Sequence, residues 1–216
     1  MKRFLFLLSA VALFVLTSAA PAKKNVLIIG DSVSQGYTKI AAEELADIAN
    51  VVHNPGNGKD TPNGLKFIDE WLALNDWDVI HFNWGLWDLC YRHPESKTQG
   101  NRDKVNGTIA VPLDEYAKNL EELVIKLKAS GAKLIFATTT YVPINEEGRF
   151  VEDAQRYNKV AEEIMKRHKV TVNPLYKYSV KIHPQYGKGD NDVHYTDEGC
   201  AALSVPVIKS LRKALK

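Results

Sequence analysis

The sequence predicts an α/β fold: a three-layer α/β/α sandwich around a parallel five-stranded sheet. Short apolar segments rich in Val and Ile recur at residues 26–29, 49–53, 78–84, 133–139 and 170–172. Each is followed by a longer segment with apolar residues at helical spacing. Strands that alternate with helices form parallel sheets covered on both faces, and such strands are almost continuously apolar.

The helices are expected at residues 38–48, 64–74, 113–130, 151–168 and 197–215. Their apolar residues recur every three or four positions, the spacing that places side chains on one helical face. These residues include Ile40, Ala41, Leu45 and Ile48 in the first helix, Leu65, Ile68 and Leu72 in the second, Leu120, Leu123 and Leu127 in the third, and Val160 and Ile164 in the fourth. Gly131 is the expected stop of the third helix.

One connection, residues 89–112, is long and polar. Connections of this length in compact domains are usually functional or mobile. We expect a short hairpin around residues 105–111 and a wall over the site built by Tyr91, Arg92 and the rest of this loop. No internal repeat, linker or low-complexity tract divides the chain, so we predict a single domain over residues 23–216.

Residues 1–22 have the pattern of an export signal. Lys2 and Arg3 precede an apolar segment at residues 4–16, and small residues follow it, ending in Ala-Pro-Ala at Ala22. The apolar segment is shorter than the ~20 residues that cross a bilayer. We therefore expect cleavage after Ala22, a periplasmic or extracellular location, and no stable membrane anchor.

The charge of the chain is balanced. The full sequence has 28 basic and 26 acidic residues. Removal of the expected leader takes away Lys2 and Arg3 and leaves equal numbers of the two. Such a balance gives no indication of nucleic acid as a partner. Cys90 and Cys200 can form a disulfide in an exported protein or remain as two buried thiols, and the sequence leaves both open.

Two residues far apart in the sequence occupy positions suited to nucleophilic catalysis. Ser32 follows the first strand on the turn into a helix, at the sheet edge where open α/β folds bind ligands. His194 precedes the last helix, which Thr196 can cap. A histidine can activate a serine hydroxyl because its pKa lies near neutrality. Asp192 and Asp190 are both candidates for the acid that orients His194.

Hydrolysis by a serine also needs N–H donors for the oxyanion of the tetrahedral intermediate. The Ser32 N–H is a candidate because it lies near a helix N-terminus. Gly58, in the glycine-rich segment 54–58 after the second strand, can bring its N–H close to a ligand. Asn83, after the third strand, can donate from its side-chain amide. Asp31 is expected to be structural and to accept backbone N–H bonds.

Four segments in order resemble the sequence blocks of the SGNH (GDSL-type) hydrolases. They are Gly30-Asp31-Ser32, Asn54 to Gly58, Asn83 to Asp88, and Asp192 to His194. The resemblance spans nearly all of residues 23–216. It implies the flavodoxin-like SGNH fold, a serine nucleophile and the hydrolysis of esters.

Two of these blocks depart from the family pattern. The third block of the family usually reads Gly-x-Asn-Asp, but Trp87 stands here where the asparagine belongs, so Asn83 is expected to take its role. The last block usually has Asp three residues before His, and that position here is Asn191. Asp192, one residue closer, is the expected acid, and Asn191 or a backbone carbonyl are the alternatives.

Aromatic residues lie at the same sheet edge. Trp84 and Trp87 belong to the third block, and Tyr141 follows the fourth strand. Aromatic rings can stack on a sugar or contact an acyl group, so we expect all three at the substrate site. No His or Cys pair has the spacing of a metal site, and we expect neither a metal nor another cofactor.

These observations predict an exported serine esterase with the catalytic residues Ser32, His194 and Asp192. The expected substrate is a small-molecule or polysaccharide ester, and short acyl groups such as acetyl on carbohydrates are preferred. One alternative is a lipid esterase or thioesterase of the same family. The other is a carbohydrate-binding protein with weakened catalysis, which the two departures from the family pattern motivate.

Overall fold

Five parallel strands form the centre of the computed structural model, which describes residues 22–216. The strand order is β2-β1-β3-β6-β7, and every neighbouring pair is parallel. The strands are β1 (Lys24–Ile29), β2 (Ala49–His53), β3 (Val79–Phe82), β6 (Lys133–Ala137) and β7 (Thr171–Asn173). The predicted five-stranded parallel sheet is confirmed. The expected export signal lies outside the described residues, apart from Ala22.

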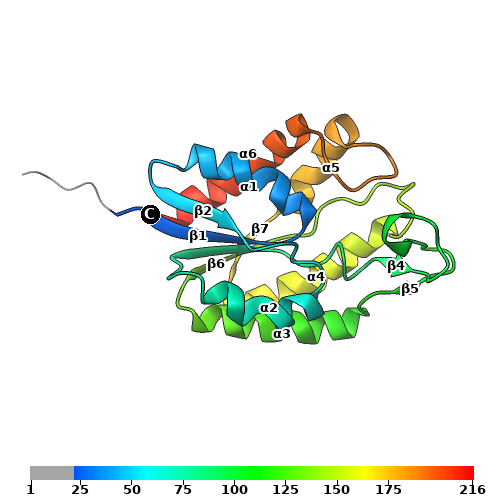
Figure 1. Cartoon of the computed structure of the whole chain (residues 1–216), viewed down its shortest axis with the longest axis horizontal. Coiled ribbons are helices and arrows are strands. Elements are labelled where there is room, and N and C mark those ends of the chain that lie inside the picture. The colour runs from blue at the N-terminus through cyan, green and yellow to red at the C-terminus, as the bar shows by residue number, and fades with distance from the viewer. Residues whose placement is uncertain (1–21) are drawn as a thin grey trace, which may run out of the picture.

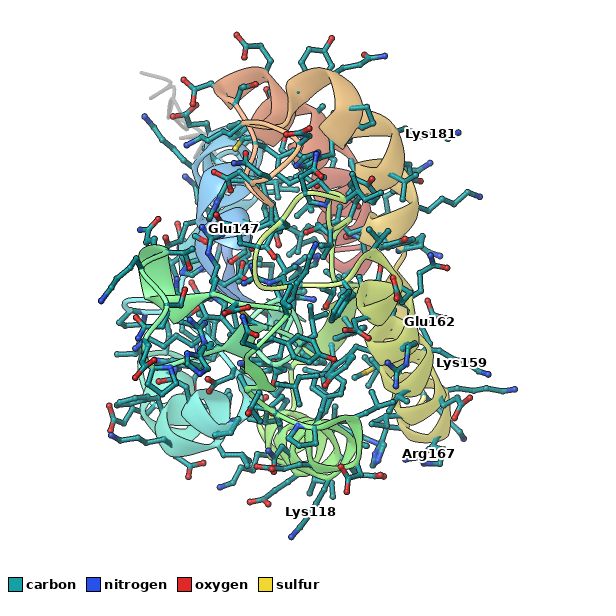
Figure 2. The ribbon with its side chains drawn as sticks, turned by 90° about the vertical axis from the view of Figure 1, so that its right-hand side faces the viewer. Lys118, Glu147, Lys159, Glu162, Arg167 and Lys181 are labelled. Carbon is teal, nitrogen blue, oxygen red and sulfur yellow. The ribbon has the colours of Figure 1, made fainter. Side chains whose placement is uncertain are left out.

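Helices cover both faces of the sheet and complete the predicted three-layer sandwich (Figure 1). One face carries α1 (Ser32–Glu44), α5 (Leu175–Tyr186) and α6 (Asp197–Ala214), and the other carries α2 (Thr61–Leu72), α3 (Leu113–Ala129) and α4 (Val151–His168). Figure 2 shows charged side chains of both signs, among them Lys118, Lys159 and Glu162, pointing away from the sheet.

The core explains why the strands are apolar along their whole length. Residues 26–29 of β1 and all of β3 are buried, because helices pack against both faces of these central strands. Phe82 and Phe136 meet edge to face across β3 and β6, with ring centroids 5.6 Å apart. No helix within residues 22–216 is long and apolar enough to cross a lipid bilayer.

Three helices differ from the sequence-based expectation. α1 begins at Ser32 rather than at residue 38, because Asp31 caps it by accepting a hydrogen bond from the Val33 N–H at 2.9 Å. α2 begins at Thr61 rather than at residue 64, because Asp60 caps it. α5 was not expected at all. Its core-facing residues Leu175, Ser179 and His183 lie four positions apart, but two of the three are polar, so no apolar stripe marks the helix in the sequence.

The expected hairpin has a different pair of strands. β4 (Tyr91–Arg92) pairs antiparallel with β5 (Thr108–Ile109), so only one of its strands falls within residues 105–111. The intervening loop contains the short helix η1 (Gln99–Asn101). This region extends beyond the carboxyl ends of the sheet strands (Figure 1).

The two cysteines are free thiols. Cys200 lies beside Gly36 of α1, whereas Cys90 lies beside Gly148 on the connection that precedes α4. Of the two alternatives that the sequence left open, the structure therefore has the unbridged one.

Asp88 ties the loop after β3 to the start of α2. Its Oδ1 accepts hydrogen bonds from the Thr61 N–H at 2.8 Å and the Thr61 hydroxyl at 2.6 Å. Its Oδ2 is buried without a hydrogen-bond partner within residues 22–216. Burial raises the pKa of Asp88, and the two bonds from Thr61 lower it by less, so the resulting pKa is about 7.

We expect Asp88→Asn to reduce the dependence of stability on pH. The pKa of Asp88 is raised in the folded state, so its contribution is complete below its ordinary pKa of 3.8 and is lost as pH rises through about 7. At about 1.4 kcal/mol per pKa unit, the loss is at most roughly 4 kcal/mol. Urea unfolding at a series of pH values measures it. Parallel pH profiles for the variant and the wild type would contradict the raised pKa.

Candidate active site

The turn after β1 presents Ser32 at the carboxyl edge of the sheet. Gly30 fixes this turn, since its N–H donates to Asn54 Oδ1 at 3.0 Å and its carbonyl accepts from the Gly58 N–H at 2.7 Å. Ser32 is the first residue of α1, where backbone N–H groups have no acceptor within the helix. The Ser32 N–H is therefore free to bind an oxyanion.

His194 approaches Ser32 from the other end of the chain. The two residues are 162 positions apart, and the Ser32 Oγ lies 2.8 Å from His194 Nε2. His194 is held on the loop before α6 because Thr196 caps that helix, accepting a bond from the Gly199 N–H at 3.2 Å. This spacing lets the imidazole accept the serine proton directly.

Asp192 is the acid that contacts His194. Its Oδ1 lies 2.5 Å from His194 Nδ1 and 2.9 Å from the His194 N–H. Partial burial raises the pKa of Asp192, but the hydrogen bonds from His194 outweigh it and lower the pKa below its ordinary value. An ionised Asp192 keeps the proton on Nδ1 and leaves Nε2 as the acceptor. Asp190 instead accepts a bond from Asn145 Nδ2 at 2.7 Å, and Asn191 is exposed.

Asp31 has the structural role expected from the sequence. It is buried and accepts the Val33 N–H at the start of α1. Burial raises its pKa, whereas the Val33 hydrogen bond and the charge of Arg149 act in the opposite direction. Its carboxyl group is thus engaged next to the proposed nucleophile.

Two of the expected oxyanion donors are engaged elsewhere, and those expectations are corrected. The Gly58 N–H donates to the Gly30 carbonyl, and the lack of a side chain at Gly58 lets the turns after β1 and β2 approach each other closely. The Asn83 amide donates to the Ala137 carbonyl at 2.7 Å and to Thr139 Oγ1 at 3.2 Å. The Asn83 amide therefore links the residue after β3 to the end of β6 and the segment that follows it.

Two of the three expected aromatic contacts are also corrected. Trp84 is only 1% exposed and donates from Nε1 to the Gly58 carbonyl, so it belongs to the core. Tyr141 packs edge to face on His183 and does not line the cavity at Ser32. Trp87 does line that cavity, and it carries the guanidinium of Arg92 4.9 Å above its ring.

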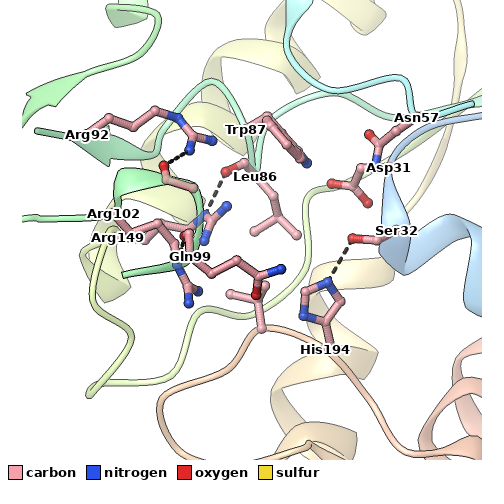
Figure 3. Close-up of a pocket in the computed structure, with 12 residues that line it drawn as sticks. Asp31, Ser32, Asn57, Leu86, Trp87, Arg92, Gln99, Arg102, Arg149 and His194 are labelled. Carbon is pink, nitrogen blue, oxygen red and sulfur yellow. Dashed lines mark hydrogen bonds between the residues drawn. The ribbon is translucent and has the colours of Figure 1, made fainter. Parts of the chain in front are cut away.

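A cavity of about 350 Å³ opens over Ser32 and His194 (Figure 3). Its wall contains Asn57, Leu86, Trp87, Arg92, Gln99, Gly100, Arg102 and Arg149. The expectation that Tyr91, Arg92 and the rest of the loop cover the site is correct for Arg92 and for Gln99 and Arg102 of that loop, but Tyr91 does not line the cavity. The side chain of Asn57 was not predicted at the site, because the pattern of segment 54–58 indicates a role only for its glycines. No group of three or more His, Cys, Asp or Glu residues within residues 22–216 is arranged to hold a metal ion.

Comparison with known families matches residues 28–202 to the GDSL-like lipase/acylhydrolase family. Similar solved structures include the acetyl xylan esterase AlAXEase, with a TM-score of 0.69 and 18% identity over 87% of this chain and 99% of that one. The lipase/acylhydrolase from Enterococcus faecalis has a TM-score of 0.71 and 18% identity over 89% and 97%. Axe2, an acetylxylan esterase from Geobacillus stearothermophilus, has a TM-score of 0.68 and 16% identity over 87% and 94%. No curated protein matches the sequence.

We expect Asp192→Asn to lower kcat by about a hundredfold or more, because the neutral amide no longer holds His194 in the required tautomer. Hydrolysis of p-nitrophenyl acetate measures this loss. Asp190→Asn is the matched control: it removes the same charge from the same loop but leaves the contact of Asp192 with His194. Equal losses in the two variants would show that Asp192 has no special role.

Proposed function

The chain belongs to the GDSL-like lipase/acylhydrolase family and is an ester-hydrolysing enzyme, and we propose that it removes short acyl groups, such as acetyl, from carbohydrates. Ser32 is the proposed nucleophile, His194 the base, and Asp192 the acid that orients the base. The observation that carries this assignment is the continuous chain of contacts from Ser32 Oγ through both nitrogens of His194 to Asp192 Oδ1.

The contacts support a two-step reaction. His194 Nε2 takes the hydroxyl proton as Ser32 Oγ attacks the ester carbonyl, and a tetrahedral oxyanion forms. When this intermediate collapses, the bond to the sugar oxygen breaks and His194 returns the proton to that oxygen. Water then attacks the acyl-enzyme while His194 accepts its proton. The carboxylic acid leaves, and the proton goes back to Ser32.

Two other side chains take the place of the Gly58 N–H and the Asn83 amide as oxyanion donors, since those two groups are engaged elsewhere. We assign the oxyanion site to the Ser32 N–H, the amide N–H of Asn57 and the indole N–H of Trp87. Asn57 Oδ1 accepts a bond from the Lys59 N–H at 2.8 Å, which fixes the amide. Within residues 22–216, no acceptor engages the Asn57 NH₂ or Trp87 Nε1. Both side chains line the cavity that contains Ser32 (Figure 3).

Three features support a carbohydrate ester as the substrate. Two of the similar structures are acetyl xylan esterases. The cavity of about 350 Å³ is at the small end of ligand sites, and its lining includes the polar side chains of Asn57 and Gln99 beside three arginines. The leader-like pattern of residues 1–22 supports action outside the cytoplasm, where polysaccharides are met.

We expect the protein to release acetate from acetylated xylo-oligosaccharides and to hydrolyse p-nitrophenyl acetate with a higher kcat/KM than p-nitrophenyl octanoate. Ser32→Ala should abolish both activities. Ser34→Ala should keep them, since Ser34 is a buried neighbour bonded to His53. Faster octanoate hydrolysis would favour a lipid esterase. Sugar binding without turnover would favour a binding protein and overturn the proposal.

We expect Trp87→Phe to lower kcat by about tenfold to a hundredfold, with a smaller change in KM. The variant loses an oxyanion donor but keeps an aromatic ring under Arg92. Trp77→Phe is the matched control, because Trp77 precedes β3 at the opposite edge of the sheet. An unchanged kcat in Trp87→Phe would remove the indole from the oxyanion site.

A further inference from the structure

Three arginines line the cavity at Ser32, and the proposed reaction uses none of them. Arg92 comes from β4, Arg102 follows η1, and Arg149 lies just before α4. Their guanidinium groups lie together on the wall that faces Ser32 and His194 (Figure 3). Three positive groups at one small site need a physical explanation.

The backbone places two of these arginines side by side. Arg92 and Arg102 form an antiparallel bridge, the arrangement in which opposite side chains share one face. Like charges in such a pair repel each other and destabilise the fold unless another group compensates. The loop between β4 and β5 thus folds back on β4 and holds the two charges together at the cavity.

One buried carboxylate offsets only part of this charge. Glu146 is fully buried, and its Oε1 accepts bonds from Arg102 Nη1 and Arg149 Nη1, each at 2.8 Å. Glu147 is 3.8 Å from Arg102, but it is half exposed at the surface (Figure 2). Arg92 has no carboxylate within 4.0 Å in the described part of the chain. The wall therefore keeps an excess of positive charge.

Backbone carbonyls hold the guanidinium groups in place. Arg149 Nε donates to the Leu86 carbonyl at 2.6 Å, Arg102 Nε donates to the Gln99 carbonyl at 3.0 Å, and Arg92 Nη1 donates to the Gly100 carbonyl. Arg149 is only 5% exposed, yet it lines the cavity. Nη2 of Arg92 and of Arg149 has no hydrogen-bond acceptor within residues 22–216. Fixed guanidinium groups with unused donors match the planar geometry of a carboxylate.

We propose that the arginine wall binds a carboxylate on the sugar whose ester Ser32 hydrolyses, so that the preferred substrate is an acylated acidic sugar. This inference rests on the proposed sugar-esterase function. The charges of Arg149 and Arg102 act on Asp31 and Asp192 across the cavity, but neither carboxylate lies within 4.0 Å of an arginine nitrogen. Asp31 instead caps α1 and Asp192 contacts His194, so the guanidinium groups remain open to a ligand. A bound acidic sugar therefore places its carboxylate on the arginines and its acyl group toward Ser32.

The test compares two substrates that differ in one group. They are an O-acetylated methyl glucuronoside and the matching O-acetylated methyl glucoside, which carries a hydroxymethyl group instead of the carboxylate. We expect kcat/KM for the acidic sugar to exceed that for the neutral sugar by about tenfold or more, and the ratio to shrink as salt is added. A ratio near one would overturn the inference.

Variants locate the preference on the wall. Arg92→Gln removes a guanidinium without leaving a buried carboxylate unpaired, and it should lower the ratio of the two kcat/KM values by about tenfold. Lys97→Gln is the control, because it makes the same charge change on the same loop at an exposed residue outside the cavity. Equal ratios in the two variants would show a general charge effect and overturn the assignment.

Two further measurements separate the possible failures. The enzyme could hydrolyse p-nitrophenyl acetate through Ser32 and yet show no preference between the two sugars. This result would support the proposed ester hydrolysis and refute only the role of the arginine wall. If no ester reacts, calorimetric binding of glucuronate in preference to glucose still supports the wall, while the proposed function fails. If an acetylated, sulfated glucoside reacts faster than the glucuronoside, the wall recognises a sulfate rather than a carboxylate, and the proposal is overturned.

Discussion

The hydrogen bonds of Gly30 hold the turn that carries the proposed nucleophile. Its N–H binds the Asn54 side chain and its carbonyl accepts the Gly58 N–H, so the turns after β1 and β2 are fixed to each other. A Cβ on Gly58 would lie 2.6 Å from the Gly30 carbonyl oxygen, and only glycine permits that approach. Ser32 is thereby presented to a histidine from the other end of the chain.

Buried acidic side chains hold the loops around this turn. Asp31 caps α1, Asp88 binds the first residue of α2, and Glu146 joins Arg102 to Arg149. Each of these side chains accepts at least one bond from a backbone N–H, which partly offsets the free-energy cost of its burial. The substrate cavity therefore lies on loops whose positions are set by charge and hydrogen bonding rather than by apolar packing alone.

Local patterns were sufficient for much of the fold and for the centre of the site. The apolar strands, the helical stripes and the cap at Thr196 depend on residues close together in the sequence. They placed Ser32 and His194 at the same edge of the sheet, where the structure brings them to 2.8 Å. α5 was missed because its buried face contains Ser179 and His183 rather than a run of apolar residues.

The sequence by itself determined the parallel sheet and the pairing of a serine after β1 with a histidine before α6, since these follow from periodicity and motif order. Tertiary structure alone decided which N–H groups remain free and which side chains reach the cavity. The Gly58 N–H and the Asn83 amide are bound to neighbouring strands and turns, whereas Arg102 and Arg149 converge from different loops. Such partners are distant in sequence, and only the folded chain brings them within hydrogen-bond distance.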